Sequence, residues 1–228
     1  MTRTTPPAVC RAVTLPAANL RRLIAAVLPC AASDGLLPAL NAVRLETTGR
    51  SLYAVATDRY TMAVARHTGP GLTRPRTAGA TIPRAEATAM LRLVPRGHGG
   101  PVTVRIRQDR CVTLTTAGIT HRTPAADRLY GRFPDWRAAL TRLLDGAPVR
   151  GGQPVHVNPA YLARFAAASD GDPRGLRARL HRTGYSHPVL IVSAGDWFLG
   201  ALMSIRPSSA AADPRAAWET DLAPRAAA

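Results

Sequence analysis

Apolar and polar residues follow one arrangement that occurs three times along the chain: an alternating run, a helix-type run, then three more alternating runs. The first copy begins at residue 11, and Pro16 precedes its helix-type run. The apolar residues of that run are spaced i, i+3, i+4, i+7 and i+8: Leu20, Leu23, Ile24, Val27 and Leu28. This spacing places them on one face of a helix, and a proline near a helix start loses no hydrogen bond. Residues 11–28 therefore predict a strand followed by an amphipathic helix.

The same plan returns at residues 79–95 and 153–169. In the second copy Pro83 precedes the helix, whose apolar stripe consists of Met90, Leu93 and Val94. In the third copy Asn158 is the expected N-cap and Pro159 the first helical residue. The residues of the third helix that we expect to face the core are Leu162, Phe165 and Ala166.

Strand-type alternation follows each helix. Residues 102–107, for example, read Val-Thr-Val-Arg-Ile-Arg, which has the period of a half-buried strand. The predicted strand segments are 41–48, 51–58, 61–68, 102–109, 110–117, 119–125, 175–183, 187–195 and 197–206. The chain thus predicts an α+β fold built from three β-α-β-β-β half-domains, with helices on one face of antiparallel sheets.

A half-domain of this kind leaves one sheet face and one helix stripe uncovered, so half-domains are expected to pair. We expect a complete domain at residues 11–128, divided into halves at 11–78 and 79–128. A linker at 129–152 then leads to a third, unpaired half-domain at 153–207. Residues 1–10 and 208–228 are expected to be disordered, although Trp218 is an unusual residue to leave in solvent.

The charge of the chain is strongly positive. Its 228 residues include 30 basic residues, all arginine, against 14 acidic ones, for a formal charge of +16. Such a balance favours a polyanionic partner such as nucleic acid, bound through phosphate contacts. A coding bias toward GC-rich codons is a second explanation, because it would raise the arginine content without any function.

Catalysis finds no support in the sequence. The 6 histidines and 3 cysteines have no metal-ligand spacing, and no nucleophile elbow, phosphate loop or dinucleotide fingerprint occurs. We therefore expect no enzyme activity, no cofactor and no metal. The first residues lack a signal-peptide core, and no apolar run reaches the ~20 residues of a membrane span, which favours a cytoplasmic protein with reduced cysteines.

The join between the segments 51–58 and 61–68 is unusual. A tight hairpin needs two turn residues, typically Asn-Gly or Asp-Gly. Here the string is Thr57-Asp58-Arg59-Tyr60-Thr61-Met62. Asp58 is expected to accept hydrogen bonds from nearby backbone N–H groups in an Asx-type turn. Tyr60 and Met62 have two open interpretations, as core residues or as part of a binding surface.

Five segments carry a family resemblance through their order: LNAVRLET, ATDRYTMAVA, TIPRAEATAMLRL, GRFPDWRAAL and LGALMSIRP. Together they resemble the bacterial DNA polymerase III sliding clamp, the β subunit. Residues 13–140 resemble the clamp's middle domain and the stretch leading into its last domain, and residues 155–207 resemble the second half of that last domain. A family member has three domains of two halves each and forms a dimeric ring, whereas this chain has three halves in all.

The resemblance implies a pocket that captures short linear peptides of DNA polymerases, clamp loaders and repair proteins. We name the matching residues of this chain the peptide site: Leu40, Thr57, Tyr60, Met62, Pro134, Ala138, Ala139, Ala201, Met203, Ser204, Ile205 and Arg206. Methionine suits such a pocket because its side chain adapts to varied peptides. Three positions depart from the family, which usually has glycine at Arg59, a long side chain at Ala138 and proline at Ser204. Arg206 is also explained as a solvated charge at a strand end.

The resemblance also implies nonspecific contact between the helices and the phosphates of duplex DNA. The helix residues that fit this role, or that of solvated surface charges, are Arg21, Arg22, Arg84, Arg92 and Arg164. Two functions stay open. The first is a processivity factor that encircles DNA as a homo-oligomeric ring. The second is a monomeric module that captures peptides and modulates the host clamp without encircling DNA.

Overall fold

The computed structural model describes residues 11–48, 50–69, 78–96, 100–107, 111–124, 131–149, 155–169, 175–183 and 187–205. Its helices are α1 (Ala17–Val27), α2 (Arg84–Leu93), α4 (Trp136–Leu144) and α5 (Pro159–Leu162), with 3₁₀ segments η1 (Leu28–Cys30) and η2 (Ala163–Ser169). Its strands are β1 (Arg11–Pro16), β2 (Ala42–Thr48), β3 (Ser51–Thr57), β4 (Thr61–Thr68), β5 (Ala78–Pro83), β6 (Pro101–Ile106), β7 (Val112–Thr116), β8 (Ile119–Thr123), β9 (Arg177–His181), β10 (Val189–Ala194) and β11 (Phe198–Met203). The termini expected to be disordered, 1–10 and 208–228, lie outside the described residues.

The strands form two antiparallel sheets, and the α+β prediction is confirmed. Each strand segment predicted to follow a helix contains a strand. The strand predicted to open the third repeat is not one in the described residues, where only His156 forms an isolated bridge, with Ile205. The four-stranded sheet has the order β1-β6-β7-β8 and the seven-stranded sheet the order β5-β2-β3-β4-β11-β10-β9. The first two repeats exchange their leading strands, since β1 pairs with β6 and β5 pairs with β2. This exchange explains why one repeat cannot complete either sheet alone.

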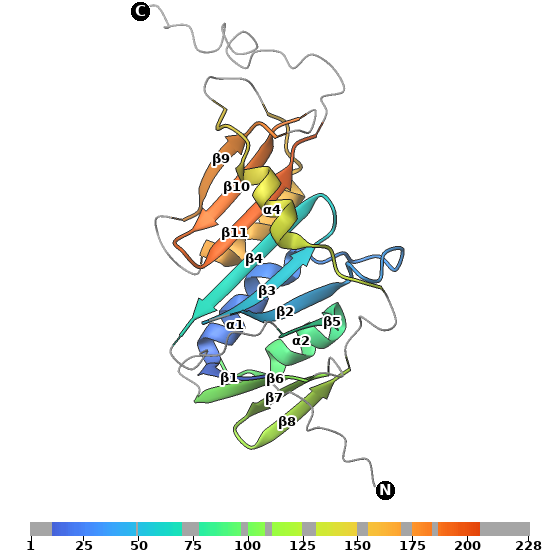
Figure 1. The fold of residues 1–228 in the computed structure, drawn as a ribbon, viewed down its shortest axis with the longest axis vertical. Helices are drawn as coiled ribbons and strands as arrows, with labels where there is room; N and C mark the ends of the chain where they lie inside the picture. The colour runs from blue at the N-terminus through green and yellow to red at the C-terminus, as the bar shows by residue number, and fades with distance from the viewer. Residues whose placement is uncertain are drawn as a thin grey trace, which may run out of the picture.

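The third repeat extends the sheet of the first. Strand β11 pairs with β4 in antiparallel register, from Phe198 opposite Ala65 to Leu202 opposite Thr61. Strands β10 and β9 then follow outward. In Figure 1 the four-stranded sheet lies near one end of the long axis, and β9 and β10 lie near the other.

Alternate residues of the seven-stranded sheet face two separate cores. On its inner face, Leu52 and small residues such as Ala54 and Ala63 join a large core with α1, α2 and the four-stranded sheet. These small side chains leave room for α1 to pack closely against β3 and β4. The predicted stripe of α1 is confirmed for its four buried members, Leu20, Leu23, Ile24 and Val27.

The third helix differs in part from its prediction. Asn158 is its N-cap as expected, because its Oδ1 accepts the N–H of Ala160 at 2.9 Å. Phe165 is fully buried, but Leu162 is 41% exposed and Ala166 is exposed, so their predicted inward orientation is wrong. From residue 163 the segment is a 3₁₀ helix with three residues per turn. Ala168 therefore shares the buried face with Phe165.

Helix α4 lies within residues 129–152, the stretch that the sequence predicts as a linker. Asp135 begins it, and the carboxylate of Asp135 accepts the N–H of Ala138 at 3.1 Å. The helix lies across the outer face of the seven-stranded sheet (Figure 1), so helices cover both faces of this sheet. The outer core consists of Val55, Val64, Phe133, Trp136, Leu140, Leu143, Val189, Ile191 and Ala201.

Candidate functional site

The loop between β3 and β4 is organised by one carboxylate. Asp58 Oδ1 accepts the N–H groups of Tyr60 (3.0 Å) and Thr61 (2.7 Å) and the hydroxyl of Thr61 (2.9 Å), while Oδ2 pairs with Arg164. The Asx-type turn predicted for Asp58 is confirmed. Burial alone would raise the pKa of Asp58, but hydrogen bonds from Arg164 and Thr61, with the charge of Arg164, outweigh burial and hold that pKa below its usual value.

The backbone at Arg59 has a conformation that suits glycine. Its φ is 83°, in the left-handed region that costs other residues about 1–2 kcal/mol. This geometry gives a physical reason for the glycine that the family resemblance places at this position. The guanidinium of Arg59 lies beside Tyr60, 5.7 Å from the ring centroid.

Tyr60 belongs to the surface and not to a core. Its side chain is 50% exposed and stacks on Tyr161 of α5, with ring centroids 5.8 Å apart. The guanidinium of Arg164 lies 4.3 Å from the centroid of Tyr161. The third repeat therefore supports the loop of the first through the Asp58–Arg164 ion pair, the stack of Tyr60 on Tyr161, and a hydrogen bond from Arg164 to the hydroxyl of Thr61 at 3.0 Å.

Pairing of β4 with β11 brings two parts of the peptide site together. Met62 lies opposite Ala201, and the N–H of Met203 donates to the carbonyl oxygen of Tyr60 at 2.9 Å. Met62 and Met203 are partly buried and pack against the outer core below α4. Residues far apart in sequence thus form one surface at the end of these strands.

The remaining members of the peptide site differ in accessibility. Leu40 and Thr57 are buried, so they offer little surface to a ligand. Ser204 is half-buried and donates a hydrogen bond to the carbonyl oxygen of Pro188 at 2.6 Å. Pro134, Ala138 and Ile205 are exposed and Ala139 is half-buried, whereas Arg206 lies outside the described residues.

Most of the arginines expected to contact DNA have other contacts. Arg21 and Arg84 donate hydrogen bonds to backbone carbonyl oxygens, Arg84 at 2.7 Å, and Arg164 pairs with Asp58. Arg22 lies over the ring of Trp197, with its guanidinium carbon 3.7 Å from the ring centroid. Arg92 is exposed near the end of α2. Four of the five side chains therefore stabilise the fold.

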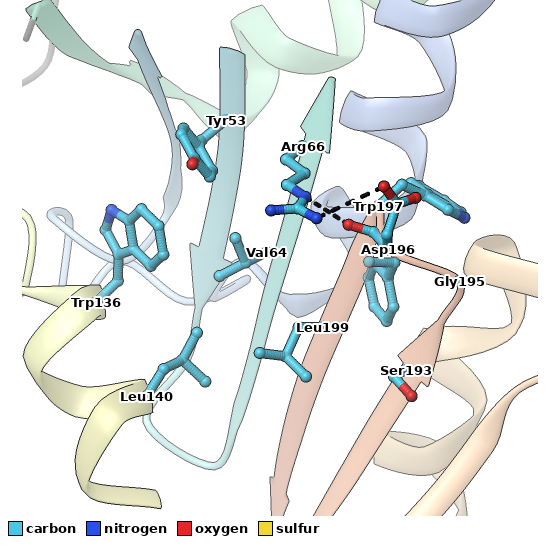
Figure 2. Close-up of a pocket in the computed structure, with 11 residues that line it drawn as sticks. Tyr53, Val64, Arg66, Trp136, Leu140, Ser193, Gly195, Asp196, Trp197 and Leu199 are labelled. Atoms are coloured by element: carbon cyan, nitrogen blue, oxygen red, sulfur yellow. Dashed lines mark hydrogen bonds and ion pairs between the residues drawn. The ribbon is translucent and has the colours of Figure 1, made fainter. Parts of the chain in front are cut away.

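A cavity of about 310 Å³ lies between α4 and the outer face of the sheet (Figure 2). The residues that line it include Val64, Leu140, Leu199 and four aromatic residues, and we name it the aromatic cavity: Tyr53, Trp136, Trp197 and Phe198. Tyr53 and Trp136 pack with the outer core, whereas Trp197 and Phe198 pack with the inner core. An ion pair between Arg66 and Asp196, 3.6 Å apart, marks its edge. Sequence reasoning missed this cavity, although the alternation of β3 places Tyr53 on the face opposite Leu52 and Ala54.

Helix α4 is held at its first turn by Arg137. This side chain pairs with the buried carboxylate of Glu46 on β2 and lies 4.1 Å from the centroid of Trp136. Tyr53 packs on Trp136 with ring centroids 5.4 Å apart. The position of α4, and with it one wall of both the peptide site and the aromatic cavity, therefore depends on these contacts.

Three further features concern metal binding, the reactivity of a thiol and the length of the apolar helices. Within the described ranges, no three His, Cys, Asp or Glu side chains gather where they could hold a metal ion. Burial raises the pKa of the Cys30 thiol to about 12, so the thiol stays protonated at neutral pH. None of the helices in the described part of the chain is long and apolar enough to cross a membrane.

Comparisons with known proteins gave one family-model match and several solved structures of similar fold. Residues 14–135 match the family model for the central domain of the DNA polymerase III beta subunit. A DNA polymerase sliding clamp from Pseudomonas aeruginosa is similar over 89% of this chain and 68% of its own, at 19% identity and a TM-score of 0.72. The beta subunit from Thermotoga maritima is similar over 91% and 68%, at 15% identity and a TM-score of 0.69. A P. aeruginosa clamp bound to griselimycin is similar over 91% and 68%, at 18% identity and a TM-score of 0.61. No curated protein sequence matched the chain.

Proposed function

The chain belongs to the DNA polymerase III beta-subunit family, and on that premise we propose that it is a non-catalytic accessory protein of DNA replication or repair that binds short linear peptides at the peptide site. Its partners are DNA polymerases, clamp loaders or repair proteins that carry such peptides.

One observation carries this proposal: the pairing of β4 with β11. The sequence predicts three half-domains where the family resemblance implies six, yet the two segments that supply most of the site lie side by side, joined by the bond from Met203 to Tyr60. Tyr60 and Ile205, which are 50% and 47% exposed, border the partly buried Met62 and Met203. An exposed rim around apolar side chains is typical of a site that binds a short apolar peptide.

The test is a fluorescence-polarisation titration of the protein with a labelled clamp-binding peptide from a replicative polymerase. Ile205→Glu places a charge in the site and should weaken binding about tenfold or more, since burying an unpaired carboxylate is costly. Ile119→Glu is the matched control, because Ile119 is 55% exposed on the distant strand β8. Equal affinity of the two variants, or no binding by the parent protein, would refute the proposal. Griselimycin, which was bound to the P. aeruginosa clamp, supplies a second ligand for the same comparison.

A ring that tracks DNA is the second candidate function. It is favoured by the charge of +16 and by the two terminal strands, β8 and β9, which lie at opposite ends of the molecule (Figure 1). Head-to-tail pairing of β8 with β9 of another copy would be a heterologous contact, which generates a ring where the rotation between copies closes and an open filament where it does not. One observation opposes this pairing. Residues 147–149 already form backbone hydrogen bonds with Leu180 and Arg182, so they occupy the outer edge of β9.

The mass in solution separates the two candidates. A stable oligomer that loses mass in Ile119→Glu, and that stays on circular DNA but slides off linear DNA, would support the ring. A monomer near the chain mass of 24.2 kDa that binds the peptide would support the capture of peptides without encircling DNA. Light scattering on a sizing column gives this mass directly.

A further inference from the structure

The aromatic cavity and Trp218 both lie outside the proposed function. The cavity has nearly the smallest volume of a typical ligand pocket, about 300–1,000 Å³. A volume of about 310 Å³ lined by Tyr53, Trp136 and Leu140 suits one large aromatic side chain with its neighbours better than a cofactor. Aromatic side chains pack favourably on one another in offset or edge-to-face arrangements.

Within residues 206–228, the last large apolar residues are Trp218 and Leu222, in the sequence Ala-Trp-Glu-Thr-Asp-Leu. Glu219 and Asp221 give this stretch two negative charges in a chain whose net charge is +16. The cavity edge offers the cation that such a segment needs, because Arg66 is 44% exposed and its present partner, Asp196, is 92% exposed. A salt bridge with an exposed partner is weak and is readily exchanged for another carboxylate.

We propose that the segment Trp218–Leu222 docks in the aromatic cavity of its own chain, with the indole of Trp218 between α4 and the sheet and Glu219 or Asp221 against Arg66. The proposal goes beyond peptide binding, because it assigns a second binding site and names its occupant. It also bears on the peptide site, since α4 contributes Trp136 and Leu140 to the cavity and Ala138 and Ala139 to the peptide site.

The length of the intervening chain fits this docking. Leu199 lies in the cavity wall, and Ile205 is six residues further along, at most about 20 Å away at ~3.3 Å per residue. The 13 residues from Ile205 to Trp218 have a root-mean-square span of about 20 Å as a flexible coil, and about 45 Å when extended. A tether whose average length matches the distance to its site gives a high effective concentration.

The experiment uses the full chain labelled with 5-fluorotryptophan, with the Trp218 resonance assigned by Trp218→Phe. Docking predicts a Trp218 resonance that differs from its position in urea, and that is several-fold less sensitive to a soluble paramagnetic agent. The difference should stay the same on dilution. A difference that disappears on dilution would mean that the tail of a second copy occupies the cavity, which overturns the proposal.

Ser193→Phe fills the cavity from its half-buried wall, and Thr113→Phe is the matched control on β7 in the other sheet. The first should return the Trp218 resonance to its unfolded position and the second should not. If Ser193→Phe fails to fold, Glu219→Lys with Asp221→Lys replaces it, with Asp213→Lys as its control. A Trp218 resonance at its unfolded position in the parent protein, or one that neither set of changes moves, would overturn the proposal.

Discussion

Replacing Asp58 with asparagine should destabilise the native state by about 2 kcal/mol at neutral pH. The side chains of Asp58 and Arg164 are 10% and 23% exposed, so their ion pair is largely shielded from water. Asparagine can keep Oδ1 and the three hydrogen bonds that it accepts, but its amide would face Arg164 with a donor. The change therefore removes one charge-assisted bond, which contributes about 1.5–3 kcal/mol. With an m-value of about 2 kcal/mol/M, the urea midpoint should fall by about 1 M.

The loss of stability in Asp58→Asn should depend on pH. The pKa of Asp58 is lower in the native state than its ordinary value, so the native state binds this proton less readily than the unfolded chain does. Stability from the charged form is therefore fully present above the unfolded-state pKa of about 3.9, and it is lost as the pH falls through the native-state pKa. Asp58→Asn carries no such proton. The difference in the free energy of unfolding between the parent protein and the variant should shrink below about pH 4.

Urea titrations followed by circular dichroism from pH 3 to pH 7 provide the measurement. The matched control is Asp196→Asn, which breaks an ion pair whose carboxylate is 92% exposed and should cost less than about 0.5 kcal/mol. A cycle with Arg164→Met isolates the coupling between the two charges. An equal loss at pH 3 and pH 7, or a loss no larger than that of the control, would refute the reasoning.

Three further changes test other features of the structure. Arg59→Gly should be more stable than Arg59→Ala by about 1 kcal/mol in the same urea assay, because φ is 83° there, and the reverse order would contradict the loop geometry. Gly200→Ala should lower stability by about 1–3 kcal/mol, because a Cβ would lie 2.6 Å from the ring of Phe165, and a shorter side chain at Phe165 should relieve the loss. Cys30, whose pKa burial raises to about 12, should resist alkylation by iodoacetamide at pH 8 in the native state and react in urea, and rapid native-state labelling located at Cys30 by mass spectrometry would contradict its burial.

The local pattern of apolar and polar residues was sufficient to predict most of the individual helices and strands. Alternation predicts each of the segments that become β2–β4, β6–β8 and β9–β11, because a half-buried strand imposes a period of two whatever its partner is. The stripe of Leu20, Leu23, Ile24 and Val27 likewise follows from helix geometry alone. The turn at Asp58 and the N-cap at Asn158 depend on bonds within a few residues, and both are confirmed.

Only the tertiary structure decided how the third repeat joins the others. The pairing of β11 with β4, the stack of Tyr60 on Tyr161 and the position of α4 above Tyr53 connect segments that no local period relates. Phe165 of the 3₁₀ segment likewise packs beside Gly200 of β11, a contact that no local period predicts. The sequence by itself therefore determined most elements of the repeating unit and most of the residues that face inward, with Leu162 and Ala166 as exceptions. Long-range packing decided where the units meet, and both the peptide site and the aromatic cavity lie at that junction.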